Sequence, residues 1–305
     1  MKTPLIEPVH LIKGKTPFPN CNCLLIEDRT RTVVDTGMEH AVLLECDPLK
    51  VDLVLNTHAH VDHMHGNWGF QNARIGFHRF SEAAAQDQEV FGQDYILSMW
   101  SRLMPEPLDL EYVLGQPGER MLIRKSTMVA YPASRVDFTF ESGDELDLGR
   151  VKLRAVYLPG HCRGHSGFYW EKEGLLFSAD IDFSEGGPWY YSESADIDEF
   201  IDSINRIIEI DPRIIVPGHG RVIKAPIKEA ARRFLEHFSR RDETILRQLA
   251  RPCTLESLMN RNLIIPEYIR PTLIFWEKVM FLKHLNRLIG LGEVREEEGV
   301  YYRVS

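Results

Sequence analysis

The feature that most constrains this 305-residue chain is segment 57–63, Thr-His-Ala-His-Val-Asp-His, which places three imidazoles and one carboxylate close together. Imidazole nitrogens and carboxylate oxygens are the ligands that zinc takes in catalytic sites, about three for each ion with one position left open. Alternate side chains of a loop can point to different sides, so one short loop can supply two neighbouring ions. We therefore expect His58 and His60 to serve a first ion, and Asp62 and His63 a second.

The remaining ligands should lie at the ends of other strands, because the loop alone cannot complete two ions. Segment 51–56 has the pattern of a short buried strand and leads directly into the His-rich loop. Segments 151–158, 174–179 and 213–216 have a similar apolar or alternating pattern. Each of these three segments is followed by one potential ligand, in the order His161, Asp180 and His219.

The motif at 57–63 resembles the HxHxDH signature of metallo-β-lactamase-like hydrolases, and the three downstream ligands follow in that family's order. Segment 34–37, Val-Asp-Thr-Gly, resembles the family's early strand and turn. The resemblance covers about residues 20–225 and implies an α/β fold, a four-layer αββα sandwich with the metals at one edge of two sheets. It also implies the ligand sets: one ion is held by His58, His60 and His161, the other by Asp62, His63 and His219, with Asp180 bridging the two.

Such a site predicts a definite chemistry. Two divalent ions, zinc being favoured and iron or manganese being alternatives, lower the pKa of a shared water so that a bridging hydroxide can attack a carbonyl carbon or a phosphorus. Asp62 is expected to be catalytic as well as a ligand, by orienting the hydroxide and passing a proton to the leaving group. His165 lies in a Gly-His-Ser sequence that resembles glyoxalase II, and we expect it to contact the substrate or to orient His161. Asp35 is expected to hold a ligand loop or a histidine.

Residues 79–135 interrupt the pattern of the catalytic domain. The first half has a helical pattern rich in aromatic and Met residues, and the second half has prolines and no clear period. We interpret the segment as an insertion that forms either a lid over the metals or a homodimer interface. A surface helical hairpin without a catalytic role is the third interpretation. The apolar side chains that would form such a lid are Phe91, Tyr95, Met99, Trp100 and Met104.

The pattern changes after residue 225, which divides the chain into a catalytic domain, 1–225, and a small domain, 226–305. The small domain shows three helical patterns followed by a hairpin that turns at Glu298-Gly299, the order of elements in a winged helix. The helical patterns cover 227–250, 254–262 and 277–292. A C-terminal winged helix resembles the lactamase-like branch that includes a single-strand-specific endoribonuclease.

The metal site does not decide the substrate, because the same hydroxide can cleave thioesters, lactones, β-lactams and phosphodiesters. The apolar insertion favours a small-molecule ester or thioester. Residues 228–305 carry 14 basic and 11 acidic side chains, which favours RNA, but four glutamates near the hairpin would repel phosphates. Those glutamates are Glu293, Glu296, Glu297 and Glu298. We therefore expect ester-type hydrolysis, with an endoribonuclease or phosphodiesterase as the alternative.

A protein of a different class is the third hypothesis: a DNA-binding regulator whose metal site is a sensor. Its recognition helix would be 277–292, with Lys278, Lys283 and Arg287 available to contact DNA.

The cell compartment is predicted from what the sequence does not contain. No apolar run approaches the roughly 20 residues that a membrane span needs, so no membrane partner is expected. The N-terminal segment has no apolar region of the kind found in secretory signals. The chain has five cysteines, an odd number that cannot all pair in disulfides within one chain. This count favours reduced thiols and a cytoplasmic protein.

Overall fold

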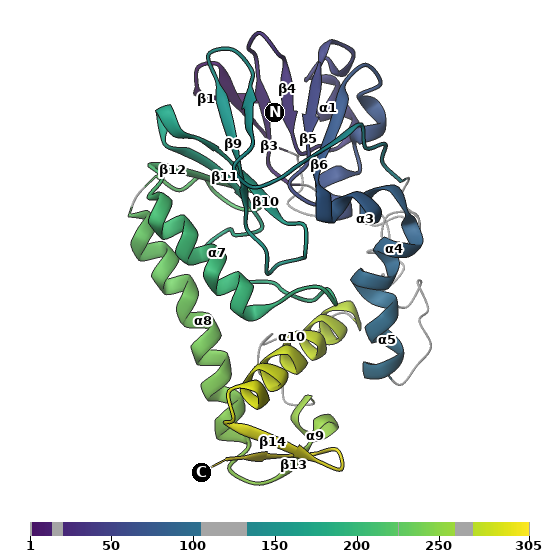
Figure 1. Ribbon diagram of the computed structural model, residues 1–305, viewed down its shortest axis with the longest axis vertical. Helices are drawn as coiled ribbons and strands as arrows, with labels where there is room; N and C mark the ends of the chain where they lie inside the picture. Colours follow the sequence, from purple (N-terminus) through teal and green to yellow (C-terminus); the bar gives the residue numbers. More distant parts are fainter. Residues whose placement is uncertain (1, 14–20, 105–132, 225, 260–270, 305) are drawn as a thin grey trace.

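The structure is a computed structural model that describes residues 2–13, 21–104, 133–224, 226–259 and 271–304 (Figure 1). The strands of its two large sheets are β1 (Lys2–Ile6), β2 (Val9–Ile12), β3 (Cys23–Ile26), β4 (Thr32–Val34), β5 (Leu53–Leu55), β6 (Arg74–His78), β7 (Phe138–Phe140), β8 (Glu145–Asp147), β9 (Lys152–Tyr157), β10 (Ser166–Trp170), β11 (Leu175–Ala179) and β12 (Ile214–Pro217). The longer helical segments are α1 (His40–Leu44), α2 (Val61–Met64), α3 (Glu82–Gln86), α4 (Gln88–Gly92), the π-helical turn η4 (Gln93–Leu97), α5 (Ser98–Leu103), α7 (Ile197–Ile210), α8 (Ile227–Gln248), α9 (Leu255–Met259) and α10 (Pro271–Gly290). A third, small sheet contains β13 (Cys253–Thr254), β14 (Val294–Glu297) and β15 (Val300–Arg303).

Two sheets lie face to face in the upper part of the molecule as drawn in Figure 1. The first has the strand order β1-β2-β3-β4-β5-β6-β7, and the second has the order β12-β11-β10-β9-β8. The core between them is built from alternate residues of the strands, such as Leu24 and Ile26 of β3 and Phe177 of β11. The residues in between point outward, and Leu25 belongs to the core on the outer face of its sheet. This two-residue period is what a strand buried on both faces requires.

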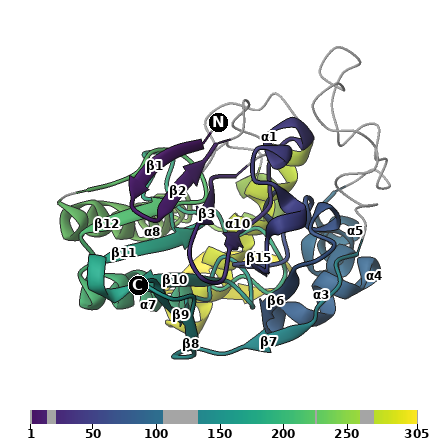
Figure 2. The same ribbon diagram turned by 90° about the horizontal axis from the view of Figure 1, so that it is seen from above.

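Helices cover the outer face of each sheet, which completes four layers. Figure 2 shows α7 and α8 outside the five-stranded sheet, and α1 and α3 to α5 outside the seven-stranded sheet. The expected αββα sandwich is therefore confirmed. The strands expected at 51–56, 151–158, 174–179 and 213–216 are confirmed as β5, β9, β11 and β12.

Two local features depend on one or two residues each. Asp196 caps α7, because its Oδ1 accepts a hydrogen bond from the backbone N–H of Glu199 at 2.9 Å. Glu298 and Gly299 both have positive φ, 51° and 79°, and they form the two-residue turn between β14 and β15.

The first half of the predicted insertion is helical, from α3 to α5, while its residues 105–132 lie outside the described part of the chain. The last helix packs against α10, and the ring centroids of Trp100 and Phe275 are 5.1 Å apart. Trp100 is only 2% exposed. It therefore belongs to a core shared with the C-terminal segment and is not exposed at the surface as an interface residue would be, while the lid stays a prediction.

The C-terminal segment has the order α8-β13-α9-α10-β14-β15, and its sheet has the order β13-β15-β14. This order is compatible with a winged helix, which stays a prediction. The boundary after residue 225 also stays a prediction, because one continuous core runs from the outer face of the large sheet through α5 to α10. Among the described residues, no helix has the length and apolar character needed to span a membrane.

Candidate metal centre

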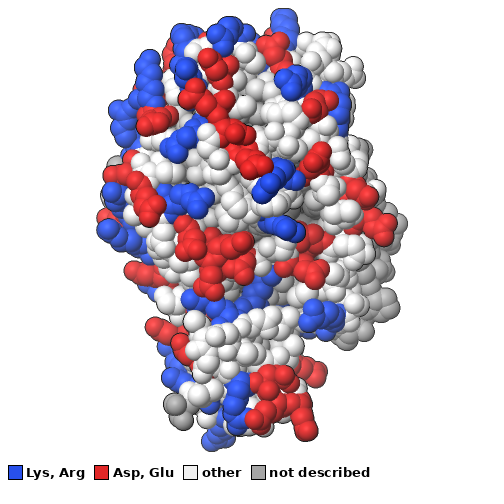
Figure 3. Space-filling model, in the orientation of Figure 1, with Lys and Arg blue, Asp and Glu red and all other residues white. Residues whose placement is uncertain are grey.

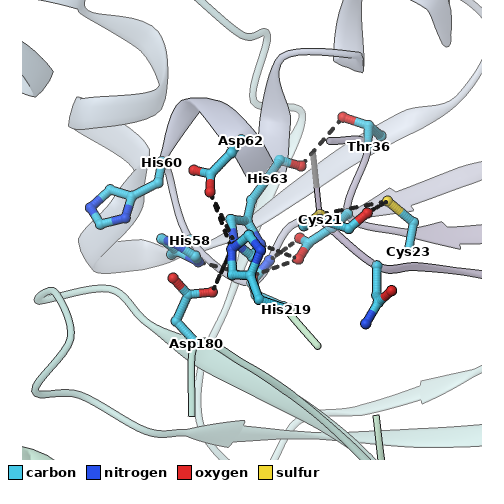
Figure 4. Close-up of polar contacts among 12 residues, drawn as sticks. Cys21, Cys23, Thr36, His58, His60, Asp62, His63, Asp180 and His219 are labelled. Atoms are coloured by element: carbon cyan, nitrogen blue, oxygen red, sulfur yellow. Dashed lines mark hydrogen bonds and ion pairs between the residues drawn. The ribbon is translucent and has the colours of Figure 1, made fainter. Parts of the chain in front are cut away.

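The seven predicted ligands converge at one edge of the two sheets, on loops that follow strand ends and on the short helix α2, and Figure 4 labels all of them except His161. The potential ligand atoms of these seven residues fall into two groups, and within each group they lie within 4.8 Å of one another. The first group is His58, His60, His161 and Asp180, and the second is Asp62, His63 and His219. The structure thus brings together every ligand that the motif and the strand ends predicted.

Asp180 lies between the two groups. Its Oδ2 is 3.1 Å from Nε2 of His161 in the first group. Its Oδ1 is 2.8 Å from Nε2 of His63 in the second. One carboxylate therefore faces both sets of imidazoles, as a bridging ligand must.

The first group consists mainly of buried neutral imidazoles. Nδ1 of His60 and Nε2 of His161 are 2.9 Å apart. Burial, together with neighbouring histidines, holds the pKa of His58 and of His60 well below the ordinary value. The Nε2 atoms of both rings are buried without a hydrogen-bond partner. Buried imidazole nitrogens without a hydrogen-bond partner, gathered beside a carboxylate, have the chemistry of a cation site.

The second group is more open to solvent. Nε2 of His219 lies 3.2 Å from Oδ2 of Asp62, and these two side chains are 28% and 17% exposed. Burial opposes ionisation of Asp62, but His63 and His219 lower its pKa to about 2. Burial also opposes a charge on His63, yet Asp180 and its other anionic neighbours raise the pKa of that imidazole. The electrostatic field at the second group therefore favours a positive charge. The site opens to solvent on the side of Asp62 and His219, which are its exposed members.

Asp35 supports the second group as expected. Its Oδ2 lies 2.7 Å from Nδ1 of His63. Its two oxygens also accept hydrogen bonds from the backbone N–H and the hydroxyl of Thr57, both at 2.8 Å. Asp35 thus fixes a ligand and the start of the ligand loop together. It adopts a left-handed backbone conformation with φ of 56°, an unfavourable state that is often found at functional sites.

His165 has a different role from the one expected. Its side chain is fully buried, and its Nδ1 lies 2.7 Å from the carbonyl oxygen of Leu158. Its Nε2 accepts a hydrogen bond from the backbone N–H of Asp180 at 3.1 Å. Both nitrogens are used, so the assignment of His165 as a catalytic residue that contacts the substrate is wrong. It positions the backbone of Asp180, and neither of these two hydrogen bonds is to His161.

Two supporting groups were not predicted. The carbonyl oxygen of Trp189 accepts a hydrogen bond from Nδ1 of His161 at 2.7 Å. Asn22 donates from Nδ2 to the carbonyl oxygen of Pro217 at 2.8 Å, and its backbone N–H donates to Gly218 at 2.6 Å, so it holds the loop that carries His219. Neither residue has a sequence signal of its own, because both act through contacts with distant parts of the chain.

The close packing of the site explains one glycine. A Cβ atom at Gly218 would lie 2.7 Å from Cε1 of His63. The Pro-Gly-His sequence at 217–219 therefore lets the loop pass directly over a ligand ring.

The residues present fit a pair of divalent cations. Five imidazoles and two carboxylates are a donor set that zinc, iron or manganese accepts, and seven ligands exceed what one tetrahedral ion takes.

Comparison with known proteins agrees with this geometry. The family model described as the metallo-beta-lactamase superfamily matches residues 16–219, and the chain belongs to that superfamily. The family and the ligand cluster together define a metal-dependent hydrolase.

Two relatives with assigned names share only a minority of their residues with this chain. The chain is 26% identical over 284 residues to a beta-lactamase-like protein 2 homolog of Drosophila melanogaster, a match that covers 89% of this chain and 82% of the relative. It is 31% identical over 117 residues to a hydroxyacylglutathione hydrolase of Francisella tularensis subsp. holarctica, which covers 34% of this chain and 46% of that enzyme. The chain spans less than half the length of that second relative.

Two solved structures share the fold over nearly the whole chain. A metallo-beta-lactamase family protein of Thermus thermophilus superposes with a TM-score of 0.77 at 22% identity, covering 99% of this chain and 100% of that one. A beta-lactamase domain protein of Burkholderia ambifaria gives 0.71 at 18% identity, covering 99% and 93%. The similarity extends through α8 to β15, so those proteins share the C-terminal arrangement.

Proposed function

We propose that this chain hydrolyses a carboxylic ester, thioester or lactone with two divalent ions, zinc being the expected metal and iron or manganese the alternatives. The observation that carries the proposal is the position of Asp180, whose two oxygens face two separate groups of ligands. His58, His60 and His161 would hold one ion, Asp62, His63 and His219 the other, and Asp180 both. Such a pair supplies a water of lowered pKa and positive charge beside the bond to be cleaved.

Asp62 is the residue of this chain that is best placed to handle a proton. Among the described residues, its short contacts to histidines are made through Oδ2, which leaves Oδ1 for another partner. Its low pKa makes it a carboxylate at neutral pH, so Oδ1 can accept a hydrogen bond from the attacking water and orient it. Asp62 is also partly exposed, so a substrate can reach it.

The surroundings of His60 favour an apolar acyl group. Its ring lies 6.3 Å from Phe91, 5.3 Å from Tyr95 and 6.1 Å from Tyr191, between centroids. The first two residues belong to the predicted insertion, so that segment does reach the metal centre. Aromatic rings beside the metals favour a hydrocarbon group over a highly charged one.

A hydrolysis screen tests the proposal. Metal-loaded protein is assayed against p-nitrophenyl butyrate, a glutathione thioester, an acyl lactone, a bis-aryl phosphodiester and single-stranded RNA. We expect turnover of at least one of the first three substrates, with loss of activity in Asp62→Ala. Cleavage of RNA or the phosphodiester alone would contradict the proposal.

An endoribonuclease is the second candidate, because aromatic rings beside a metal centre can also stack on bases. The hairpin of the C-terminal segment speaks against it. Glu296, Glu297 and Glu298 are exposed there, and acidic side chains gather at the foot of the molecule in Figure 3. Phosphates would be repelled from this surface.

The contacts of α10 speak against the DNA-binding hypothesis. Nζ of Lys278 donates to the carbonyl oxygen of Leu103, and Nζ of Lys283 donates to Glu193 and Ala195. Arg287 contacts Asp198 and Asp242. The cations of α10 therefore tie this helix to the rest of the chain and are not free to contact DNA.

A further inference from the structure

Two tyrosine hydroxyls meet beside the first group of ligands. The hydroxyl oxygens of Tyr95 and Tyr191 are 3.2 Å apart, and the two rings meet edge to face at 90°. Both rings contact His60, with centroids at 5.3 and 6.1 Å, and Tyr191 also contacts His161 at 6.1 Å. The pair thus lies against two candidate ligands of one ion, although the residues come from η4 and from the segment before α7.

The hydroxyl pair is fixed by several parts of the fold. Asp94, the neighbour of Tyr95, accepts hydrogen bonds from the backbone N–H and the hydroxyl of Ser194, at 2.7 and 2.9 Å. These bonds fasten η4 to the segment that carries Tyr191. On its other side, Tyr191 stacks on Trp276 of α10, with centroids 4.6 Å apart and planes at 24°. The tyrosines are therefore held in place before any substrate arrives.

The pair has one proton to spare. Two hydroxyls that bond each other use one O–H group, so the second O–H group can be donated to another acceptor. A tyrosine hydroxyl is protonated at neutral pH, so this O–H group is available as a neutral donor.

We infer that Tyr95 and Tyr191 act as one catalytic unit, which donates a hydrogen bond to the carbonyl oxygen of the substrate on the His60 side of the metal centre. This inference rests on the proposed ester-type hydrolysis. A carbonyl oxygen gains negative charge as the carbonyl carbon is attacked, and a fixed donor stabilises that charge more than it stabilises the ground state. The donor is neutral and flanked by aromatic rings. These surroundings suit the carbonyl group of an ester that carries an apolar acyl chain.

The test compares Tyr95→Phe, Tyr191→Phe and the double variant with Tyr190→Phe. Tyr190 is a matched control because its hydroxyl bonds His284 and Arg241, at 2.6 and 2.7 Å, and lies in a separate buried network. Metal content and thermal unfolding are measured for each protein. Turnover of p-nitrophenyl butyrate and calorimetric binding of methyl propylphosphonate are then compared. The phosphonate is a stable tetrahedral anion in which phosphorus replaces the carbonyl carbon of the butyryl group.

We expect each single variant at Tyr95 or Tyr191 to lose roughly ten- to a hundredfold in kcat with metal content unchanged. The double variant should lose little more than the worse single variant, because the hydroxyls share one function. Binding of the phosphonate should weaken in the same variants and not in Tyr190→Phe.

Unchanged phosphonate affinity in the double variant would overturn the inference, whether or not the wild type hydrolyses the ester. Equal losses in Tyr190→Phe would overturn it as well. By contrast, a wild type that binds the phosphonate through the tyrosines but cleaves no ester, thioester or lactone would refute the proposed function alone.

Discussion

Nδ1 of His63 lies 2.7 Å from Oδ2 of Asp35, and neither side chain is exposed to solvent. This contact fixes which nitrogen of His63 faces the metal centre, and it links the turn after β4 to the ligand loop after β5. Supporting carboxylates of this kind raise the basicity of a ligand histidine and fix its orientation.

Asp35→Asn should therefore weaken metal binding about 10- to 100-fold with little change in fold. Metal affinity is measured by competition with a chromophoric chelator. Asp137→Asn is the matched control, because Asp137 also accepts a hydrogen bond from a backbone N–H, that of Ile75, in the same sheet. Equal affinity in the two variants would mean that the Asp35–His63 contact does not support a ligand.

Replacement of Asp62 should affect turnover, whereas replacement of His165 should affect the stability of the fold. Asp62→Ala should lower kcat by about 10²–10⁴-fold while the free energy of unfolding changes little. His165→Ala should lower the free energy of unfolding by about 1–3 kcal/mol, because the buried N–H of Asp180 loses its acceptor. Urea denaturation and steady-state kinetics on the same preparations separate the two effects. A variant at His165 with full stability but a raised KM would restore the role in substrate contact.

Trp100→Ala should act on stability and not on substrate choice. Its indole is buried against Phe275 at the contact between α5 and α10, so truncation should cost about 3–5 kcal/mol. The ratio of KM values for two esters of different chain length should stay that of the wild type. A changed ratio in a protein of normal stability would show that Trp100 belongs to the substrate pocket after all.

His284 should make the fold sensitive to acid. It is buried between the hydroxyl of Tyr190 and the carboxylate of Asp242, at 2.6 Å from each, and burial lowers its pKa. The unfolded chain takes up a proton near pH ~6.5 that the folded protein does not, so stability is lost as the pH falls below that value.

The measurement is the free energy of unfolding at pH 7.5 and 5.5 in the wild type and in His284→Gln. The wild type should lose up to about 1.4 kcal/mol more than the variant over this interval. Other histidines contribute equally to both proteins and cancel in the difference. Parallel losses in the two proteins would show that His284 binds its proton equally well in the folded and unfolded states.

The ligand set could be predicted from the sequence because its signals are local. Segment 57–63 is contiguous, and His161, Asp180 and His219 each follow a strand whose pattern is visible in a few residues. The αββα fold followed from the resemblance that these residues carry. Asp35 could be assigned a supporting role because it lies in the turn of the same family element.

The supporting contacts could not be predicted, because they join residues that are distant in sequence. Asn22 reaches a loop 195 positions away, and Trp189 uses only its backbone oxygen, which any residue could supply. His165 was assigned the wrong role because a histidine beside a ligand has the same sequence pattern whether it faces the substrate or is buried. The burial of Trp100 depends on Phe275, which lies far along the chain, and no periodicity within the insertion reports that contact.

The most direct test of the account is the metal content of the purified protein, measured by elemental analysis per chain after loading with zinc and removal of the excess. The two groups joined by Asp180 predict two equivalents in the wild type and one in His219→Ala, which leaves the first group intact. One equivalent in both proteins would contradict a binuclear centre and, with it, the proposed chemistry.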